Sequence, residues 1–341
     1  MDECKAILEA FYPAIGAPIS IEEGGGTAGH CWRIVTASGK YLLRRRGKRT
    51  SEPGLVQRDH AFRRFLVAGG IPTTCALSGR NGDCFFIANG LAYELHPFVE
   101  GRFMRSDSDE ELQNLAVCLA QFHKVAAGFR GECPPMEFNQ FGAALPSHAQ
   151  RSARIDDPDG MLFALKGLYG ELDYAGRKAI AFVLSLAEKL ATEYGAALYA
   201  QVDDGFIHGD LNLTNILFAE DGSVAGLFDF DWAMPAARIR DVADALHFFA
   251  GGLPKPFSSS DIWGLTQIPC FSKQRSHLFL EAYNGCFPLS KLERSLLLCA
   301  WEARVLAFHI EGMAKVPLER RIKFLTREMP EFVQNAETLL K

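Results

Sequence analysis

Hydrophobic and polar residues alternate over five short stretches in the first hundred positions, with the period of two that is typical of β-strands. The stretches are 19–22, 31–36, 41–44, 84–88 and 91–95. Asn89-Gly90, which joins the last two, is the dipeptide that most strongly predicts a type I′ hairpin turn. Helical spacing of apolar residues occurs once in this region, over 55–68, and ends at Gly69-Gly70. We therefore predict a five-stranded antiparallel sheet with one helix packed on it.

Later in the chain the apolar residues recur mainly at helical intervals. The predicted elements are a helix that follows Ser108, a helix over 178–194, a small hairpin over 215–230 and further helices from Asp241 onward. Ser108 and Glu111 have the spacing of a capping box, in which each side chain bonds the backbone amide of the other residue. The second half of the chain is therefore predicted to be mainly helical.

The chain length agrees with two structural units. At 341 residues the chain exceeds the roughly 250 to 300 residues at which single hydrophobic cores usually stop growing. We predict an α+β fold with two lobes, a sheet-based lobe over 1–96 and a mainly helical lobe over 102–341, joined by a hinge over 97–101.

Charge argues against a nucleic-acid partner. The net charge is −5 and the positive charges are mostly scattered, so the long-range field that gathers nucleic acid is absent. One basic run, 44–49, is the exception. We interpret it as a solvated strand end or loop, with contact to nucleotide phosphates as the functional alternative.

The cysteines and the amino terminus predict a cytoplasmic protein. Nine cysteines are widely dispersed without a Cys-x-x-Cys pair, so reduced thiols are the simplest interpretation. The first residues are acidic, where a secretory signal would be basic. The most apolar stretch, 295–310, is interrupted by Glu302 and Arg304, so we expect no membrane contact. The oligomeric state is left open.

One segment carries most of the functional information. A His-Gly-Asp tripeptide at 208–210 follows an apolar strand, Asn215 comes five positions after the aspartate, and a hairpin then leads to Asp-Phe-Asp at 229–231. Kinases use this order of Asp, Asn and Asp to hold a hydroxyl nucleophile and magnesium-bound ATP. The spacing therefore indicates phosphoryl transfer.

The chemistry assigns a role to each of these residues. Phosphoryl transfer to an alcohol needs in-line positioning and charge neutralisation more than covalent help. Asp210 is our candidate for the base that takes the hydroxyl proton, and Asn215 and Asp229 are candidate Mg²⁺ ligands. Asp231 is expected to assist the metal or to contact the acceptor. Each residue alone is more often a cap or an Asx turn, but their joint spacing favours catalysis.

This motif resembles that of the aminoglycoside phosphotransferase superfamily, which includes choline kinases, type II homoserine kinases and other small-molecule kinases with a protein-kinase-like fold. The resemblance covers most of the chain, and the central motif is its most specific part. It implies ATP and Mg²⁺ as cofactors, Asp210 as catalytic base, and Asn215 and Asp229 as magnesium ligands. We expect His208 to brace the catalytic loop and Asp241 to be a helix N-cap that also braces the metal loop.

The first lobe supplies candidate contacts to the nucleotide phosphates. The backbone amides of Gly25, Gly26 and Thr27 are expected to cover the β and γ phosphates, with a plain hairpin turn as the alternative. Arg44 stands where protein kinases carry a lysine on the α and β phosphates. Asp59 is its expected helix partner, with an unpaired surface aspartate as the alternative.

The predicted hinge has a backbone pattern that suits adenine. Pro97 has no amide hydrogen and can only accept a hydrogen bond, whereas Val99 can donate one. We expect these two residues to bind the purine edge.

The acceptor is expected to be a small hydroxyl compound. Only a short segment separates Asp231 from Asp241, without an Ala-Pro-Glu element or a long activation loop that would display a peptide. An amino alcohol, a homoserine-like amino acid, a sugar and an aminoglycoside are all compatible, and the helical tail is most similar to the type II homoserine kinases. The alternatives are a protein Ser/Thr stress-type kinase and a non-catalytic nucleotide-binding module.

Two kinds of side chain are candidates for holding an amino group of the acceptor. Asp231 or Glu302 would supply negative charge, and Trp232 or Trp301 a cation-π face. For the tryptophans, packing in the core is the favoured alternative.

Overall fold

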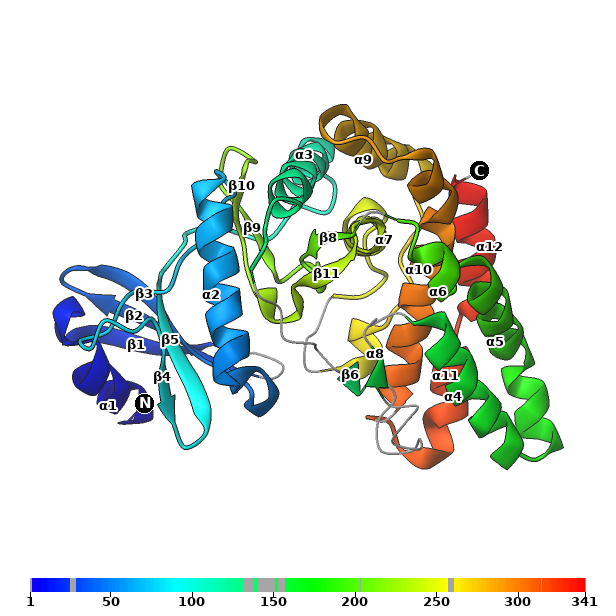
Figure 1. The fold of residues 1–341 in the computed structure, drawn as a ribbon, viewed down its shortest axis with the longest axis horizontal. Helices are drawn as coiled ribbons and strands as arrows, with labels where there is room; N and C mark the ends of the chain where they lie inside the picture. The colour runs from blue at the N-terminus through cyan, green and yellow to red at the C-terminus, as the bar shows by residue number, and fades with distance from the viewer. Residues whose placement is uncertain are drawn as a thin grey trace.

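The computed structural model has two lobes, a strand-rich lobe that carries the amino terminus and a helical lobe that carries the carboxy terminus (Figure 1). The structure describes residues 2–24, 29–131, 138–139, 151–152, 157–202, 204–256, 261–313 and 315–340. The predicted phosphate-covering residues Gly25, Gly26 and Thr27 lie outside the described residues. The prediction of an α+β fold with an antiparallel sheet in the first lobe is confirmed.

The first lobe is built on one antiparallel sheet of five strands. In spatial order the strands are β1 (Pro18–Gly24), β2 (His30–Thr36), β3 (Gly39–Arg45), β5 (Leu91–Pro97) and β4 (Phe86–Ala88). The turn between β4 and β5 has Asn89 at φ 51° and Gly90 at φ 74°, the two positive values that a type I′ turn requires. The predicted hairpin is therefore confirmed, although β4 begins two residues later than expected.

Two helices, rather than the one predicted, belong to this lobe. Helix α1 (Asp2–Phe11) buries Cys4, Ile7, Leu8 and Phe11, which pack with residues of the sheet. Helix α2 (Pro53–Ala68) lies between the sheet and the helical lobe (Figure 1). It buries Phe62 and Leu66 in the larger hydrophobic core that fills the second lobe. The sheet is thus covered by α1 and connected to the second lobe through α2.

The second lobe is mainly helical. Its helices are α3 (Asp109–Ala126), α4 (Pro158–Glu171), α5 (Tyr174–Glu193), α6 (Ala196–Tyr199), α7 (Ile239–Ala245), α8 (Ile262–Leu265), α9 (Lys273–Cys286), α10 (Lys291–Met313), α11 (Arg321–Thr326) and α12 (Met329–Leu340). The helix predicted over 178–194 is α5, which begins four residues earlier because Asp173 caps it by accepting from Gly176 N. A π-helical segment, Leu246–Ala250, continues α7.

The capping box predicted for α3 is half right. Ser108 caps the helix by accepting a hydrogen bond from Glu111 N at 3.2 Å. The Glu111 side chain does not return to Ser108 but accepts from the guanidinium groups of Arg102, from Nη2 at 2.8 Å, and of Arg105, from Nε at 2.6 Å. Two nearby arginines attract this buried carboxylate more strongly than a neutral amide does.

Short hairpins place the central motif on the surface of the helical lobe. Strand β8 (Asp204–Ile207) pairs with β11 (Met234–Ala237), and β9 (Ile216–Phe218) pairs with β10 (Val224–Leu227). A two-residue pair, β6 (Phe138–Asn139) and β7 (Arg151–Ser152), lies apart from them in sequence. The predicted strand over 224–230 ends at Leu227, because the backbone turns into a left-handed conformation at Asp229.

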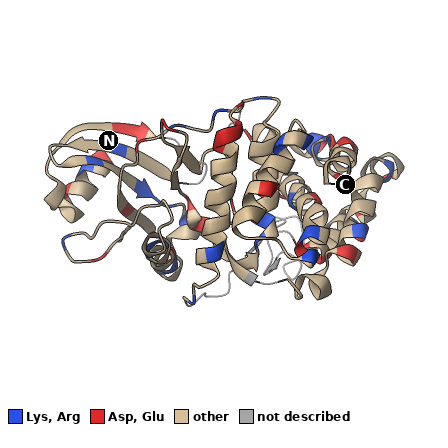
Figure 2. Cartoon of the chain, turned by 90° about the horizontal axis from the view of Figure 1, so that it is seen from above, with Lys and Arg blue, Asp and Glu red and all other residues tan. Residues whose placement is uncertain are grey.

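Charged residues are distributed over the whole molecule. Figure 2 shows Lys and Arg interspersed with Asp and Glu in both lobes. Within the described part of the chain, no helix is both long enough and apolar enough to cross a membrane.

Candidate active site

The loop after β8 is fixed by one buried carboxylate. Asp241 is fully buried and accepts from His208 N at 2.6 Å and from Gly209 N at 2.9 Å, and it pairs with His123 Nε2 at 3.1 Å. Burial alone would raise the pKa of Asp241, but the bond from His123 and the amide donors hold it below its ordinary value. Asp241 is not the predicted N-cap of α7, since Arg238 precedes the helix and the carboxylate turns back to the loop instead. Its bonds fix the catalytic loop at 208–209, rather than the metal loop that it was expected to brace.

Gly209 is required by the geometry of this loop. Its φ of +83° lies in the left-handed region, and a Cβ at this position would lie 2.2 Å from Trp232 O. Arg240 Nη2 donates to Gly209 O at 2.8 Å and so fixes the other side of the peptide. The loop thus depends on a residue without a side chain.

His208 connects the catalytic loop with the segment that carries Asp229. It is fully buried, its Nε2 bonds Phe228 O at 2.8 Å, and its Nδ1 accepts from Asp210 N at 3.3 Å. Burial lowers the pKa of His208, so the ring is neutral with the proton on Nε2. These contacts support the predicted bracing role and leave no proton for transfer to a substrate.

Asp210 and Asn215 form a hydrogen-bonded unit. Asn215 Nδ2 donates to Asp210 O at 2.7 Å and lies 3.3 Å from Asp210 Oδ2. This orientation leaves Asn215 Oδ1 with a 3.5 Å contact from Thr214 Oγ1, whose shorter bond goes to Asn212 Oδ1 at 2.7 Å. Burial raises the pKa of Asp210, as does the nearby charge of Asp229, although a third of its side chain remains exposed. The site therefore presents a reachable carboxylate with raised basicity and an amide oxygen free for a cation.

Asp229 has a strained backbone and an accessible side chain. Its φ of 61° and ψ of 65° are left-handed, a conformation that non-glycine residues adopt rarely and often at functional positions. The side chain is 42% exposed, and its Oδ1 accepts from Arg44 Nη2 at 2.7 Å. Phe228 N, one residue before Asp229, donates to Asn215 O at 2.9 Å, so Asp229 lies beside the unit of Asp210 and Asn215.

Arg44 reaches from the first lobe to this aspartate. Besides Asp229 it donates to Asp231 Oδ2 at 2.9 Å and to Glu94 Oε1 at 3.3 Å, the latter from its cross-strand neighbour on β5. Arg46, two positions later and directly after the strand, is 2% exposed and donates to Asp231 Oδ1 at 2.8 Å. The basic run at 44–49 is therefore not a solvated strand end at these two positions, and that interpretation was wrong.

The predicted pairing of Arg44 with Asp59 is also wrong. Asp59 lies buried on α2, where its two oxygens bond Arg46 Nη2 and, at 2.8 Å, Arg63 Nε. Because Arg46 lies deeper in the lobe than Arg44, it is the arginine that faces the helix. The unpaired surface aspartate, the alternative for Asp59, is excluded as well.

Both carboxylate oxygens of Asp231 form hydrogen bonds with arginines, so this side chain does not face a substrate. Its Oδ1 accepts from Arg44 Nη1 at 3.0 Å and from Arg46 Nη1, and its Oδ2 accepts from Arg44 Nη2. The two guanidinium groups take the lone pairs that a metal or an ammonium group would need. The expected contact of Asp231 with the acceptor is therefore not supported, and its place is between the lobes.

Glu302 and Trp301 are likewise unavailable to an acceptor. Glu302 is fully buried and accepts from Lys189 Nζ at 2.9 Å. Trp301 is 1% exposed, packs against Phe271 and Phe332, and so belongs to the core, which was the favoured alternative.

The hinge agrees with the geometry expected for a nucleotide edge. Strand β5 ends at Pro97, and Phe98 N donates to Lys40 O at 3.0 Å. Val99 N has no hydrogen-bond acceptor among the described residues, so it can donate to a ligand. Arg102 N then donates to Phe218 O at 2.9 Å, which ties the hinge to β9 directly after Asn215.

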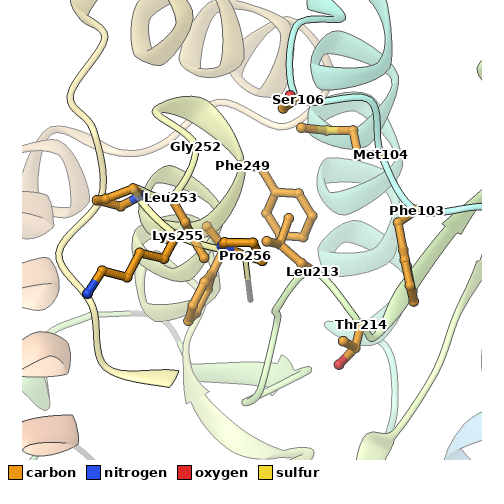
Figure 3. A pocket seen from close by; sticks show the side chains of 12 residues that line it. Phe103, Met104, Ser106, Leu213, Thr214, Phe249, Gly252, Leu253, Lys255 and Pro256 are labelled. Atoms are coloured by element: carbon orange, nitrogen blue, oxygen red, sulfur yellow. The ribbon is translucent and has the colours of Figure 1, made fainter. Parts of the chain in front are cut away.

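An apolar pocket opens beside the catalytic loop. Its volume is about 480 Å³, and Leu213 and Thr214 of the catalytic loop form part of its wall. Phe103 and Met104, after the hinge, and Phe249, after α7, are further lining residues (Figure 3). In Figure 3 the Lys255 side chain extends away from Phe249 and Leu213. The pocket is large enough for a small organic molecule.

One residue near the base was not predicted. Arg304, on α10, donates from Nε to Asp244 Oδ1 at 2.7 Å, and its Nη2 lies 3.9 Å from Asp210 Oδ1. In the sequence Arg304 was only an interruption of an apolar stretch. No spacing relates it to Asp210, ninety-four positions earlier, so only the packing of α10 on α7 could reveal it.

The oxygen atoms of Asn215 and Asp229 suit Mg²⁺ that is also bound by substrate phosphates. They do not suit a metal that is bound by protein side chains alone. No group of three or more His, Cys, Asp or Glu side chains is gathered as a metal site in the described residues. Asn215 Oδ1 and Asp229 Oδ2 are hard oxygen donors that carry no strong hydrogen bond. Mg²⁺ is usually held by one or two such protein ligands together with substrate phosphates, so these two residues fit it.

A family model for the phosphotransferase enzyme family matches residues 23–259, which include the whole central motif, most of the first lobe and the first part of the second lobe. The chain belongs to this family. The recognition of the aminoglycoside phosphotransferase superfamily from the motif is thus confirmed. No curated protein matches the chain.

Solved structures confirm the kinase-like fold of this family member. Spectinomycin phosphotransferase in complex with ADP and spectinomycin has a TM-score of 0.62 at 15% identity, covering 98% of both chains. An amicoumacin kinase in complex with AMP-PNP, Ca²⁺ and its ligand has a TM-score of 0.65 at 13% identity, covering 98% of this chain and 94% of that one. A microcompartment-associated aminopropanol kinase has a TM-score of 0.63 at 13% identity, covering 99% and 95%.

Proposed function

We propose that this phosphotransferase is an ATP-dependent kinase that transfers the γ-phosphate of ATP to a hydroxyl group of a small molecule. The observation that carries the proposal is the unit of Asp210 and Asn215. The side-chain amide nitrogen of Asn215 fixes the proposed base, Asp210, and the amide oxygen of Asn215 points away from it. Asp229 lies near this unit with an accessible carboxylate. A base and two oxygen ligands in this relation are what transfer to an alcohol requires.

Asp210 acts as the base in the proposed reaction. The acceptor oxygen bonds to the γ-phosphorus, its proton passes to Asp210, and the bond from the γ-phosphorus to the oxygen of the departing ADP breaks. The raised pKa of Asp210 makes it a stronger base than an ordinary aspartate. Mg²⁺, when held by Asn215 and Asp229, supplies charge neutralisation on the phosphates.

The nucleotide contacts stay as proposed from the sequence. Arg44 is the candidate for the α and β phosphates, supported by its reach to Asp229 at 2.7 Å. Val99 N and Pro97 O are candidates for adenine, supported by the unused amide of Val99. In the proposed division, Arg44 belongs to the first lobe (1–96) and Pro97 and Val99 to the hinge (97–101), whereas Asp210, Asn215 and Asp229 belong to the second lobe (102–341).

The acceptor is proposed to be a small hydroxyl compound. The pocket of about 480 Å³ beside Leu213 and Thr214 supports a small molecule rather than a folded protein. The solved structures that this chain resembles include kinases for spectinomycin and aminopropanol, which agree with that size class.

The proposal is tested by measuring ADP release from ATP and Mg²⁺ with a panel of amino alcohols, hydroxy acids, homoserine, sugars and aminoglycosides. We expect turnover with at least one member, and Asp210→Asn is expected to lower kcat on it by about 10²- to 10⁴-fold. ATP binding without turnover on any alcohol would reject the proposal in favour of a non-catalytic module. Phosphate transfer to proteins alone would favour the stress-type kinase.

A further inference from the structure

Arg304 stands at the side of the catalytic base that faces away from the metal ligands. Asp210 Oδ2 lies 3.3 Å from Asn215 Nδ2, whereas Asp210 Oδ1 lies 3.9 Å from Arg304 Nη2. An acceptor hydroxyl that meets the γ-phosphate in line has the rest of its molecule on the side opposite the nucleotide. Arg304 faces the Asp210 oxygen that Asn215 does not contact.

The guanidinium of Arg304 is held rigidly but is not saturated. Arg304 is 3% exposed, its Nε donates to Asp244 Oδ1 at 2.7 Å, and its Cζ lies 3.8 Å from the centre of the Phe308 ring. In the part of the chain that the structure describes, no acceptor hydrogen-bonds its Nη1 or Nη2. The 3.9 Å separation from Asp210 is an ion pair without a hydrogen bond. A buried arginine usually uses all the donors of its planar guanidinium group. The described residues therefore leave Nη1 and Nη2 available to a group from outside the chain.

We infer that Arg304 is a specificity-determining residue that binds an anionic group of the acceptor, a carboxylate or a phosphate. A carboxylate accepts two parallel hydrogen bonds from the terminal nitrogens of an arginine, whereas an ammonium group has only donors and would be repelled there. Because Arg304 Nη2 is 3.9 Å from Asp210 Oδ1, the anionic group and the reacting hydroxyl are expected on one short molecule. The substrate class is a small hydroxy acid or hydroxy amino acid.

This inference rests on the proposed function and narrows it. The carboxylates expected from sequence to hold an amino group, Asp231 and Glu302, are both occupied by basic side chains. Asp244, which lies beside Arg304, uses its Oδ1 to accept from Arg304 Nε. Arg304 Nη2, 3.9 Å from Asp210 Oδ1, is a cationic donor without a hydrogen-bond acceptor among the described residues, which favours an anionic group over an ammonium group beside the base.

The experiment compares acceptors that differ only in the charge of one end. The probes are 4-hydroxybutyrate, 4-hydroxybutyramide and 4-aminobutan-1-ol, together with homoserine and homoserine amide. ADP release is followed with wild type, Arg304→Gln and Arg304→Lys. Arg294→Gln is the control, since it makes the same charge change on α10 where the arginine bonds the Leu289 carbonyl.

We expect the wild type to prefer the carboxylate of each set by at least about tenfold in kcat/KM. In Arg304→Gln the KM of the anionic acceptor rises at least about tenfold, because binding common to ground state and transition state is lost. The neutral acceptor changes little, Arg304→Lys restores part of the preference, and Arg294→Gln leaves it unchanged. A merely structural arginine would instead lower turnover of all acceptors alike.

The outcomes separate the inference from the proposed function. Turnover that is best with a neutral or cationic acceptor overturns the inference and leaves the kinase in place. An unchanged charge preference in Arg304→Gln also overturns it. If Arg304→Gln does not fold, Arg304→Lys decides the question through the same preference, with the urea unfolding midpoint as the measure of folding. Absence of turnover on every alcohol rejects the proposed function, and the inference is rejected with it.

Discussion

In this site, the atoms of a side chain that have no hydrogen bond within the protein decide what that side chain can bind. Asp229 shows this most directly, because Arg44 occupies Oδ1 and leaves Oδ2 accessible in a left-handed backbone. We predict that Asp229→Asn lowers kcat by at least about 100-fold, since a charged ligand at the phosphates is lost. It also weakens nucleotide binding in the presence of Mg²⁺ more than in its absence. Titration with a fluorescent ATP analogue, with and without Mg²⁺, measures the difference.

The substitution is well suited to this position because asparagine tolerates the left-handed region. Asp221→Asn is the control, an exposed aspartate in the β9–β10 turn that accepts from Ser223. Equal effects of the two substitutions would show that Asp229 does not hold the metal. The urea midpoint of both variants is expected to stay close to that of wild type.

Asp241 is expected to matter for stability as well as for activity. It accepts from two backbone amides and pairs with His123 in a fully buried place, so Asp241→Asn turns one acceptor oxygen into a donor that faces an amide. We predict a loss on the order of 2 to 4 kcal/mol in the free energy of unfolding. Urea unfolding followed by circular dichroism measures it. A midpoint equal to that of wild type would contradict the bracing role.

The residues of the central motif could be predicted because they are close in sequence. Asp210, Asn215 and the Asp-Phe-Asp of 229–231 belong to one loop and one hairpin, so their spacing reports their geometry. The partners of Arg44 and Asp59 could not be predicted in the same way. Arg44 lies on β3 and Arg46 directly after it, and only the packing of α2 against this end of the strand decides which of them meets Asp59.

At the scale of elements, the turn between β8 and the catalytic loop is a place where the backbone limits the sequence. We predict that Gly209→Ala lowers both stability and kcat, because the new Cβ would lie 2.2 Å from Trp232 O and push the loop away. Gly222→Ala is a matched control, with a φ of +84° against +83° and a nearest contact of 3.5 Å. Both variants lose about 1 kcal/mol from the left-handed conformation.

The difference between these two variants isolates the steric contact. Gly209→Ala is expected to unfold at a clearly lower urea concentration than Gly222→Ala and to lose most of its activity, whereas Gly222→Ala keeps kcat. If the two variants unfold at the same urea concentration with the same kcat, the close approach of Trp232 is not a constraint on the loop.

Helix α1 was not predicted, although the sequence contains the pattern that indicates it. Cys4, Ile7, Leu8 and Phe11 have the i, i+3, i+4, i+7 spacing that indicates an amphipathic helix, and all four are buried. The sequence therefore contained the signal. Helix α4 was missed in the same way, because Asp157 as N-cap and Pro158 at the first helical position are start signals that the sequence contains.

At the scale of the whole molecule, the two lobes meet through a cluster of charges rather than through apolar packing alone. Arg44 of β3 and Arg46, which directly follows this strand, contact Asp231 of the second lobe, and Arg44 also contacts Asp229. Arg44 and Asp229, which take part in these contacts between the lobes, are also residues proposed to bind the nucleotide phosphates and Mg²⁺. On that proposal, a bound nucleotide exchanges some of these ion pairs for phosphate contacts, so closure of the lobes and occupancy of the site are coupled.

The buried carboxyl group of Asp244 makes the free energy of unfolding of the whole molecule depend on pH. Burial raises the pKa of Asp244 to about 6 from an ordinary value of 3.8, although Arg304 and Arg240 oppose the shift. Between these two pH values the folded protein binds a proton that the unfolded chain does not. Asp244 therefore adds stability as the pH falls from about 7 toward 4, and this contribution is lost as the pH rises through about 6.

We predict that Asp244→Asn removes this dependence while keeping the bond to Arg304 Nε, because the asparagine carbonyl can replace Oδ1 as acceptor. Urea unfolding of both proteins at pH 5 and pH 7.5 measures the difference in the free energy of unfolding. Relative to the variant, wild type is expected to be more stable at pH 5 than at pH 7.5, by on the order of 1 to 3 kcal/mol. Asp59, Glu94 and Asp241 have lowered pKa values and act in the opposite sense at lower pH, but they are common to both proteins and cancel. A difference that is constant with pH, or larger at pH 7.5, would show that Asp244 does not take up a proton in this range.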